Sequence, residues 1–90
     1  MYRIEFQNDA TKDALKLQKL EPPSYKKLQT LVEELKKHPR FGTGKPERLK
    51  HYKSEIWSRH ITRKHRLVYE IKEDIITVEV ISTYGHYDEK

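Results

Sequence analysis

The sequence predicts an α+β fold in which two N-terminal helices pack on one face of a twisted antiparallel sheet. Its 90 residues suit one domain with a modest core, spanning residues 1–90. Two patterns support this prediction. Residues 8–35 carry apolar side chains at the three- and four-residue spacing of amphipathic helices. Residues 55–81 contain short runs rich in β-branched and aromatic residues.

The chain opens with an alternating segment. Apolar and charged side chains alternate over residues 2–6, so we expect a half-buried strand with Tyr2, Ile4 and Phe6 inward. Asn8 or Asp9 can then cap a helix, because a short side-chain oxygen accepts hydrogen bonds from the free amides of the first turn. We expect this helix to run to about Leu20. Its apolar side consists of Ala10, Ala14, Leu17 and Leu20.

A second helix follows Pro22 and Pro23, which end the first helix and start the next. Its apolar stripe consists of Leu28, Leu31, Val32 and Leu35. The basic residues 36–38 suit the negative C-terminal end of a helix, and Pro39 ends it. Residues 42–46 are rich in Gly and are expected to form a loop.

The sequence pattern of the second half of the chain predicts a β-sheet. Residues 55–61, 65–71 and 75–81 are three short β-rich runs, joined by tight polar connections at 62–64 and 72–74. Alternation places Leu67, Tyr69 and Ile71 on one side of the middle run and Arg66, Val68 and Glu70 on the other. In the last run the apolar row is Ile76, Val78 and Val80. If the helices cover one face, Arg66 lies on the uncovered face. The directions of Trp57 and Arg59 stay open, since both sides of that run carry apolar and polar residues.

Charge is unevenly distributed along the chain. Between Lys36 and Arg66 there are eleven Lys and Arg residues but only two acids, Glu47 and Glu55, which gives this segment a net charge of +9. The remaining residues carry −4, for a total of +5. Four of the five histidines also lie in this basic segment. A compact basic surface with few acids is typical of a face that binds phosphate groups.

The composition also excludes several classes of protein. No cysteine is present, which excludes a disulfide scaffold and any thiolate metal site and is compatible with a cytoplasmic protein. No apolar run approaches the roughly 20 residues that a membrane helix needs, and no signal-peptide pattern opens the chain. The histidines lack metal-ligand spacing on a helix, and carboxylates do not cluster with them. We therefore expect no metal, no cofactor and no membrane contact.

Glu47, Arg66 and His86 are the candidate catalytic groups. RNA cleavage without a metal needs a base for the 2′-hydroxyl proton, an acid for the leaving 5′-oxygen, and cations for the phosphate transition state. A carboxylate, a histidine and an arginine can supply these roles. From composition alone the signal is weak, because such a set occurs by chance in most basic domains. Glu47 could equally be a solvated loop carboxylate paired with Lys45 or Lys50.

Three sequence blocks sharpen this interpretation. They are residues 44–51 (GKPERLKH), residues 57–62 (WSRHIT) with 65–69 (HRLVY), and the pair His86-Tyr87. Together they resemble the YoeB/Txe family of the RelE superfamily, toxins of bacterial toxin–antitoxin systems. The motifs cover about half of the chain, and the order of strand, two helices and sheet fits the remainder. The resemblance implies a RelE-like fold.

The resemblance also implies an activity and roles for residues. The activity is a ribosome-dependent mRNA endonuclease that enters the A site and cuts the codon there. Glu47 would be the general base, His86 the general acid, and Arg66 the stabiliser of the phosphate transition state. The expected RNA-binding residues are Lys45, Lys50, His51, Arg59, His60 and Tyr87. The sequence departs from the family pattern at His60, where a second Arg is usual, and at Gly85 and the tail 88–90.

Partners follow from the same resemblance. They are the 70S ribosome with mRNA in its A site and an antitoxin of the YefM/Axe kind, with operator DNA contacted only through the antitoxin complex. A homodimer is compatible with the sequence. The alternative is a catalytically silent relative that binds RNA or antitoxin without cutting. A free RNase acting on naked RNA is disfavoured, because no base-reading pocket can be identified in the sequence.

Overall fold

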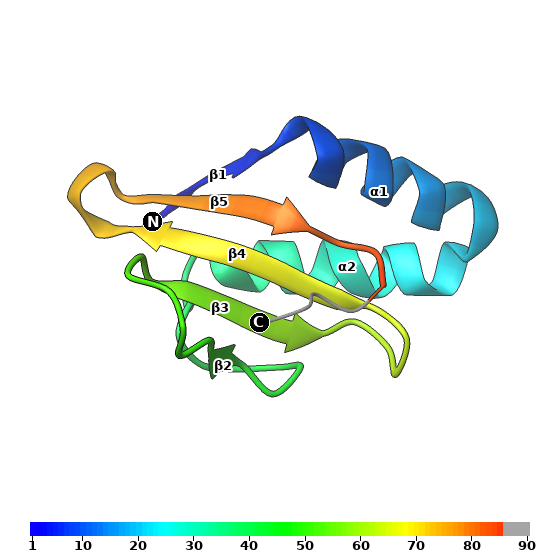
Figure 1. Ribbon diagram of the computed structural model, residues 1–90. Helices are drawn as coiled ribbons and strands as arrows, with labels where there is room; N and C mark the ends of the chain where they lie inside the picture. The colour runs from blue at the N-terminus through cyan, green and yellow to red at the C-terminus, as the bar shows by residue number, and fades with distance from the viewer. Residues whose placement is uncertain (86–90) are drawn as a thin grey trace.

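The computed structural model describes residues 1–85 and has an α+β fold built on one five-stranded sheet (Figure 1). The spatial strand order is β1-β5-β4-β3-β2. The strands are β1 (Arg3–Phe6), β2 (Glu47–Arg48), β3 (Ile56–His60), β4 (Arg66–Lys72) and β5 (Thr77–Ser82). Two helices, α1 (Asn8–Leu20) and α2 (Pro22–Leu35), lie between β1 and β2 in the sequence. The predicted α+β class is confirmed.

The sheet is mixed, so the prediction of an antiparallel sheet is wrong at one edge. β2, β3, β4 and β5 pair antiparallel in that order, but β1 pairs parallel with β5. β1 leads directly into the helices, which cross one face of the sheet, so the chain does not return beside β1 as a hairpin. The edge of β5 accepts β1 instead, and backbone bonds extend this pairing at both ends, from Arg3 N to Ile76 O and from Gln7 N to Val80 O.

Helix α1 begins with a cap different from the one expected. Gln7, not Asn8 or Asp9, is the N-cap, and its side chain makes no capping hydrogen bond. Asp9 still lies in the first turn, where a negative charge suits the positive end of the helix dipole. Ala10 and Leu17 are buried as predicted, whereas Leu20 is 58% exposed and lies off the stripe.

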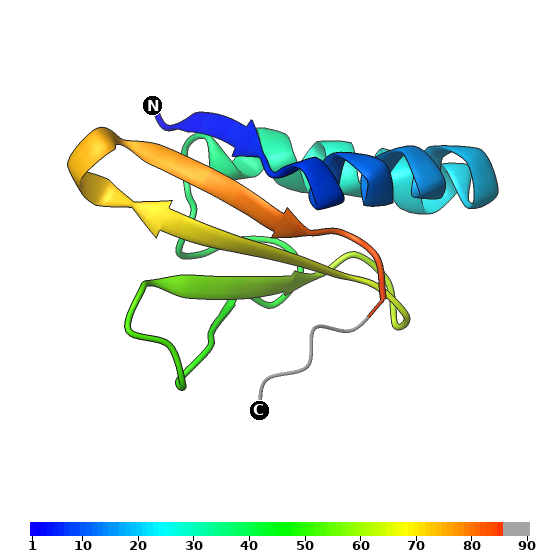
Figure 2. The same cartoon turned by 45° about the horizontal axis from the view of Figure 1, so that its top comes forward.

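Helix α2 follows the prediction closely. Its first residue is Pro22, which suits this position because a first-turn amide has no partner within the helix. Glu21 is at once the C-cap of α1 and the N-cap of α2. The two helices therefore form a tight hairpin, which Figure 2 shows lying on one side of the sheet.

The main core lies between the helix hairpin and the sheet. Its buried side chains include Leu17, Leu28, Leu31 and Leu35 from the helices and Leu67, Tyr69, Ile71, Val78 and Val80 from the sheet. Tyr2 and Ile4 pack against its rim, while Phe6 is 36% exposed. A smaller cluster of Leu49, Ile56 and Val68 lies on the other face, where the turn after β2 folds over the sheet. The predicted helix-covered face is confirmed, but the opposite face is partly covered.

The last strand starts later than expected. Residues Glu73–Ile75 form a 3₁₀ turn and Ile76 adopts a left-handed backbone with φ of 48°. Ile76 is 53% exposed, so it does not belong to the apolar row with Val78 and Val80. The chain reverses direction between β4 and β5, and this reversal requires a left-handed backbone at Ile76. The requirement of the turn overrides the preference of isoleucine for strands.

The long connection between α2 and β2 is held by one buried side chain, Arg59 of β3. Arg59 has no exposed surface. Its guanidinium donates to Glu34 Oε1 of α2 and to the phenolic oxygen of Tyr69. It also donates to three backbone carbonyls of the connection, those of His38, Phe41 and Thr43. Tyr69 in turn donates to Pro39 O at 2.6 Å. The charge is thus fully satisfied, as burial of a cation requires.

Two glycines let the connection approach this centre. Gly42 and Gly44 have φ of 126° and 86°, in the region that favours glycine. A Cβ on Gly42 would overlap the Glu34 carboxylate, and one on Gly44 would lie 2.9 Å from His60 O. His60 N donates to Gly44 O at 2.7 Å, so the connection is bonded directly to β3 just before it enters β2.

The Glu34–Arg59 pair predicts loss of stability in acid. Burial alone raises the pKa of Glu34, but hydrogen bonds from Thr43 and Arg59 outweigh it, and the net pKa lies below the ordinary value of 4.5. A lowered folded pKa means that the stabilisation is present above about pH 4.5 and is lost as pH falls through the folded pKa. We expect Glu34→Gln to reduce the unfolding free energy at pH 7 by on the order of 3 kcal/mol, and to flatten its acid dependence. Urea unfolding at pH 7 and in acid measures both effects.

Glu33→Gln is the matched control. Glu33 pairs with Lys36 on the exposed side of the same helix, and such surface pairs contribute about 0–1 kcal/mol. Equal losses in the two variants would show that the buried arginine does not depend on the Glu34 charge.

Candidate functional site

The sheet register brings three of the predicted site residues to one face. Glu47 pairs with Ser58 and Arg66 pairs with His60, and cross-strand partners point to the same side. Ser58 and His60 are two residues apart on β3, so both pairs share a face. Val68, on the same side of β4 as Arg66, belongs to the cluster on the face opposite the helices. The prediction that Arg66 lies away from the helices is confirmed. We call the face that carries Glu47, His60 and Arg66 the open face.

Arg66 has a fixed guanidinium at the start of β4. Its Nη1 donates to Thr62 O at 2.9 Å, to Arg63 O at 3.3 Å and to His65 O at 3.3 Å. These carbonyls belong to the β3–β4 turn, so the turn itself orients the side chain. Arg66 is partly exposed. A cation held in this way is oriented before any ligand arrives.

Glu47 is exposed on the two-residue strand β2. The connection upstream is bonded to β3 through Gly44, and the residue after β2 is bonded through Leu49 N to Ile56 O at 2.8 Å. β2 itself pairs with β3. This short strand was not predicted, because two residues have no periodicity to detect, yet it places the Glu47 carboxylate on the open face.

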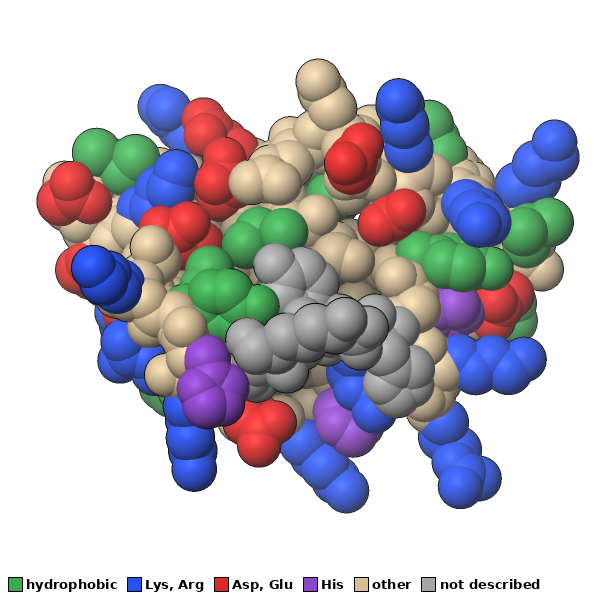
Figure 3. Space-filling model, viewed as in Figure 1, with side chains coloured by type: hydrophobic (Ala, Val, Ile, Leu, Met, Phe, Trp, Pro, Cys, Tyr) green, Lys and Arg blue, Asp and Glu red, His purple; other side chains and the backbone are tan. Residues whose placement is uncertain are grey.

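Three of the predicted RNA-binding residues lie close to Glu47 in the sequence and are exposed. Lys45 comes just before β2, and Lys50 and His51 lie in the turn that follows it. His60 is also exposed and lies beside Arg66. In Figure 3, Lys and Arg side chains extend along the β2–β3 side of this face, whereas acids gather toward the β1 edge and the β4–β5 turn.

The acidic side of the face has a clear origin in the register. Glu5 of β1 pairs with Glu79 of β5, which pairs with Glu70 of β4. Glu79 also forms an ion pair with Lys72, with 3.2 Å between Lys72 Nζ and Glu79 Oε1. The charge separation seen along the sequence is therefore a separation across the sheet, with the predicted site at the basic end.

The structure corrects one predicted RNA contact. Arg59 is completely buried on the helix side of β3 and its donors are used by protein acceptors, so its role is structural. Sequence alternation left its direction open. His65 is also buried, with 3% of its surface exposed. It lies at the β3–β4 turn, where it contacts Glu21 and Gly85.

His86 and Tyr87 lie outside the described residues. The chain is nevertheless fixed up to the residue before them. Gly85 O accepts from Arg66 N at 3.0 Å, and Gly85 N donates to His65 Nδ1 at 2.8 Å. The described chain thus ends against the first residues of β4, next to Arg66.

The remaining features of the described residues do not compete with this site. Residues 1–85 contain no cluster of three metal-ligating side chains. Neither α1 nor α2 is long and apolar enough to cross a membrane. An apolar hollow of about 400 Å³ lies on the helix side and holds none of the predicted site residues. It is lined by Phe6, Ala14, Tyr25, Leu28, Gln29, Val32 and Glu33.

Comparison with known proteins agrees with the geometry. Residues 6–87 match the family model of YoeB-like toxins of bacterial type II toxin–antitoxin systems. Toxin YoeB of Escherichia coli is 36% identical over 76 residues, which is 84% of this chain and 90% of that protein. A solved YoeB/ParE toxin from Agrobacterium tumefaciens superposes with a TM-score of 0.87 at 32% identity, covering 94% of this chain and 99% of the other.

Two solved structures from Staphylococcus aureus are also similar. A YoeB dimer superposes with a TM-score of 0.83 at 30% identity, covering 96% of this chain and 98% of the other. A heterotetrameric YoeB–YefM toxin–antitoxin complex gives 0.80 at 30% identity, covering 97% and 99%. The matches span nearly the whole chain in both sequence and structure. The chain therefore belongs to the YoeB-like toxins of bacterial type II toxin–antitoxin systems.

Proposed function

We propose that this protein is a ribosome-dependent endoribonuclease that cuts mRNA in the ribosomal A site and so inhibits translation. The observation that carries the proposal is the position of Glu47 and Arg66 on one open, basic face. Membership of a toxin family supports the biological setting. Because no base-reading pocket can be identified in the sequence, a substrate presented by the ribosome is favoured over free RNA.

The spacing of the two groups suits a phosphate between them. Their strands are separated by β3, and their partners on β3 are two residues apart. Standard sheet spacings then put the two Cα atoms about 12 Å apart. That separation leaves room for a ribose and its phosphate between the carboxylate and the guanidinium.

In the proposed reaction Glu47 accepts the proton of the 2′-hydroxyl. The 2′-oxygen forms a bond to phosphorus while the bond from phosphorus to the 5′-oxygen breaks, and His86 donates a proton to that oxygen. The products are a 2′,3′-cyclic phosphate and a 5′-hydroxyl. Arg66 stays charged and stabilises the transition state, and its bonds to turn carbonyls hold it ready to do so. None of these steps requires a metal ion.

The surrounding cations dock the RNA in this proposal. Lys45, Lys50, His51 and His60 are exposed around the two central groups, and Tyr87 is proposed as a further RNA-binding residue. Arg59 is omitted because it is buried.

The proposed partners follow from the family and its solved complexes. A YefM-like antitoxin neutralises the toxin, as the Staphylococcus aureus YoeB–YefM complex suggests by analogy. Operator DNA is contacted only through that complex. A homodimer is proposed for the free toxin, supported by the YoeB dimer from the same organism. Because ribosomes and mRNA are the proposed targets, the proposed location is the cytoplasm.

Substitution of the three central groups tests the chemistry. We expect Glu47→Gln, Arg66→Ala and His86→Ala each to slow single-turnover cleavage on programmed ribosomes by about 100-fold or more, with ribosome binding nearly unchanged. Lys72→Ala is the control, since Lys72 lies at the acidic end of β4 in a pair with Glu79. Cleavage by Glu47→Gln at the parent rate would remove Glu47 as the base. A parent protein that binds but never cuts would favour the catalytically silent alternative.

The ends of the cut RNA test the route. Attack by the 2′-hydroxyl predicts a 2′,3′-cyclic phosphate, or the 3′-phosphate formed when it hydrolyses, together with a 5′-hydroxyl. Mass spectrometry of the two fragments distinguishes these from other ends. A 3′-hydroxyl product would indicate attack by water and contradict the proposed mechanism. End analysis is preferable to chelation, because ribosomes themselves require magnesium.

Salt dependence tests the docking surface. Binding to RNA releases counterions, so ribosome affinity should fall steeply from low to high potassium. We expect Lys45→Gln with Lys50→Gln to reduce the slope of log affinity against log salt by about 2, or about one per phosphate contact. Lys26→Gln with Lys27→Gln, which removes two exposed charges from α2, should leave the slope near the parent value. Equal slopes for the two double variants would place docking elsewhere.

A further inference from the structure

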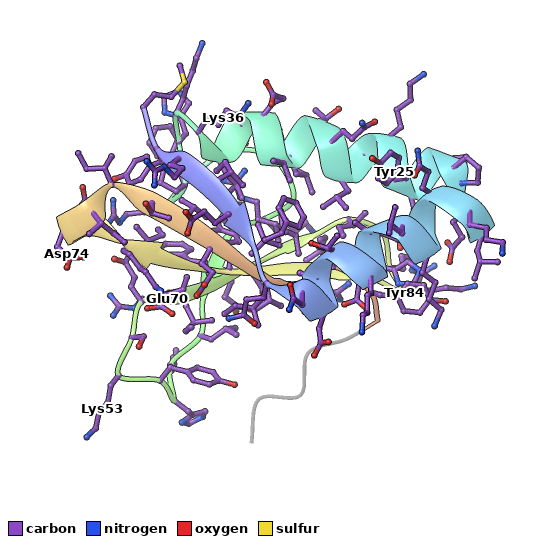
Figure 4. The ribbon with its side chains drawn as sticks, turned by 90° about the horizontal axis from the view of Figure 1, so that it is seen from above. Tyr25, Lys36, Lys53, Glu70, Asp74 and Tyr84 are labelled. Atoms are coloured by element: carbon purple, nitrogen blue, oxygen red, sulfur yellow. The ribbon has the colours of Figure 1, made fainter. Side chains whose placement is uncertain are left out.

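Two side chains that the proposed chemistry does not use hold the chain just before His86. His65 bonds through one ring nitrogen to Gly85 and through the other to Glu21, each at 2.8 Å. Glu21 lies at the junction of α1 and α2. The segment leaving β5 is therefore linked through His65 to the helix hairpin, and Figure 4 shows Tyr84 in this segment close to α1.

The hydrogen bonds fix the protonation of His65. A backbone N–H can only donate, so Nδ1, which faces Gly85 N, must carry a lone pair. A carboxylate accepts, so Nε2 must carry the proton that faces Glu21. The hydrogen bond from His65 is the largest cause of a lowered pKa of Glu21, which keeps that carboxyl ionised as an acceptor. The ring is thus locked in the Nε2–H tautomer.

Neighbouring contacts hold the same segment from other sides. The His65 ring packs on the Tyr84 ring with centroids 4.4 Å apart, and Lys16 Nζ lies 4.1 Å from the centroid of Tyr84. Thr83 donates through its hydroxyl to Ala10 O at 3.4 Å. The backbone of Gly85, the last described residue, makes two hydrogen bonds: its N–H donates to His65 Nδ1 and its carbonyl accepts from Arg66 N.

We infer that His65 is a positioning residue for the cleavage reaction, acting by fixing the backbone of Gly85, the residue that precedes His86 in the sequence. Glu21 supports it by keeping the proton on Nε2. This inference rests on the proposed function of His86 as the acid. Gly85 links the two parts of the proposed site. Its carbonyl accepts a hydrogen bond from the backbone N–H of Arg66, the proposed transition-state stabiliser.

Two substitutions separate positioning from simple packing. In His65→Asn the side-chain oxygen occupies roughly the place of Nδ1 and can accept from Gly85 N, but the side chain is too short to reach Glu21. In His65→Gln the side chain reaches toward Glu21 but offers no acceptor at the place of Nδ1. Both variants lose the ring contact with Tyr84 equally. If His65 acted through packing alone, or through its pair with Glu21, His65→Asn would not cleave faster than His65→Gln.

The experiment measures single-turnover cleavage on programmed ribosomes at saturating protein, together with hydrogen exchange of the Gly85 amide in the free toxin. We expect His65→Gln to lose Gly85 protection and to cleave about 10- to 100-fold more slowly, since small misplacements of a catalytic group have effects of this size. His65→Asn should keep the protection and cleave within about threefold of the parent. Binding to ribosomes should change little in either variant. Val32→Ala, a change in the helix layer, controls for loss of stability.

Equal cleavage rates for the Asn and Gln variants, or a fall in rate without loss of Gly85 protection, would overturn the inference. Failure of the parent to cleave would contradict the proposed function, and the Gly85 exchange data would then still report whether His65 holds the segment. Nitrogen-15 spectra of the ring give a further test. The parent should show the proton on Nε2, and Glu21→Ala should increase its population on Nδ1 while slowing cleavage. A parent ring protonated on Nδ1 would also overturn the inference.

Discussion

The buried guanidinium of Arg59 is the interaction on which the site most depends. It gathers carbonyls from the connection between α2 and β2, a carboxylate from α2 and a hydroxyl from β4 around one charge. Without a cation at this point, these carbonyls would face one another in the interior with no donor. The connection they fix leads directly into β2, so the position of Glu47 is set by an interaction on the opposite side of the sheet.

The open face is formed by short segments, and hydrogen bonds hold each segment to a neighbouring part of the fold. Arg66 is oriented by the carbonyls of its own turn, and Gly85 is bonded to the strand that Arg66 begins. These anchors are backbone groups or buried side chains, which lose less entropy on ordering than long exposed ones. The exposed lysines around them are suited to attract a polyanion, whereas the central groups are suited to define geometry.

The sequence predicts the regular parts of the fold well, because Leu28, Leu31 and Leu35 repeat with the helix period and Leu67, Tyr69 and Ile71 with the strand period. The face of Arg66 follows from the same alternation, whereas Glu47 reaches that face through the two-residue strand β2, which has no detectable sequence period. Arg59 and His65 could not be placed, since their burial depends on acceptors distant in the chain. The parallel β1 edge was also missed, because local patterns carry no information on which edge a first strand joins.

That parallel edge has a consequence for how the molecule is made. Residues 3–6 find their partners only in residues 77–80. During synthesis the first strand must therefore wait, with Ile4 and the apolar stripe of the helix hairpin exposed, until nearly all of the sheet has emerged from the ribosome. Such distant pairing is slow to form relative to local structure. The β1 edge is therefore expected to form late in folding, after the helix hairpin and the local β3–β4 and β4–β5 pairs.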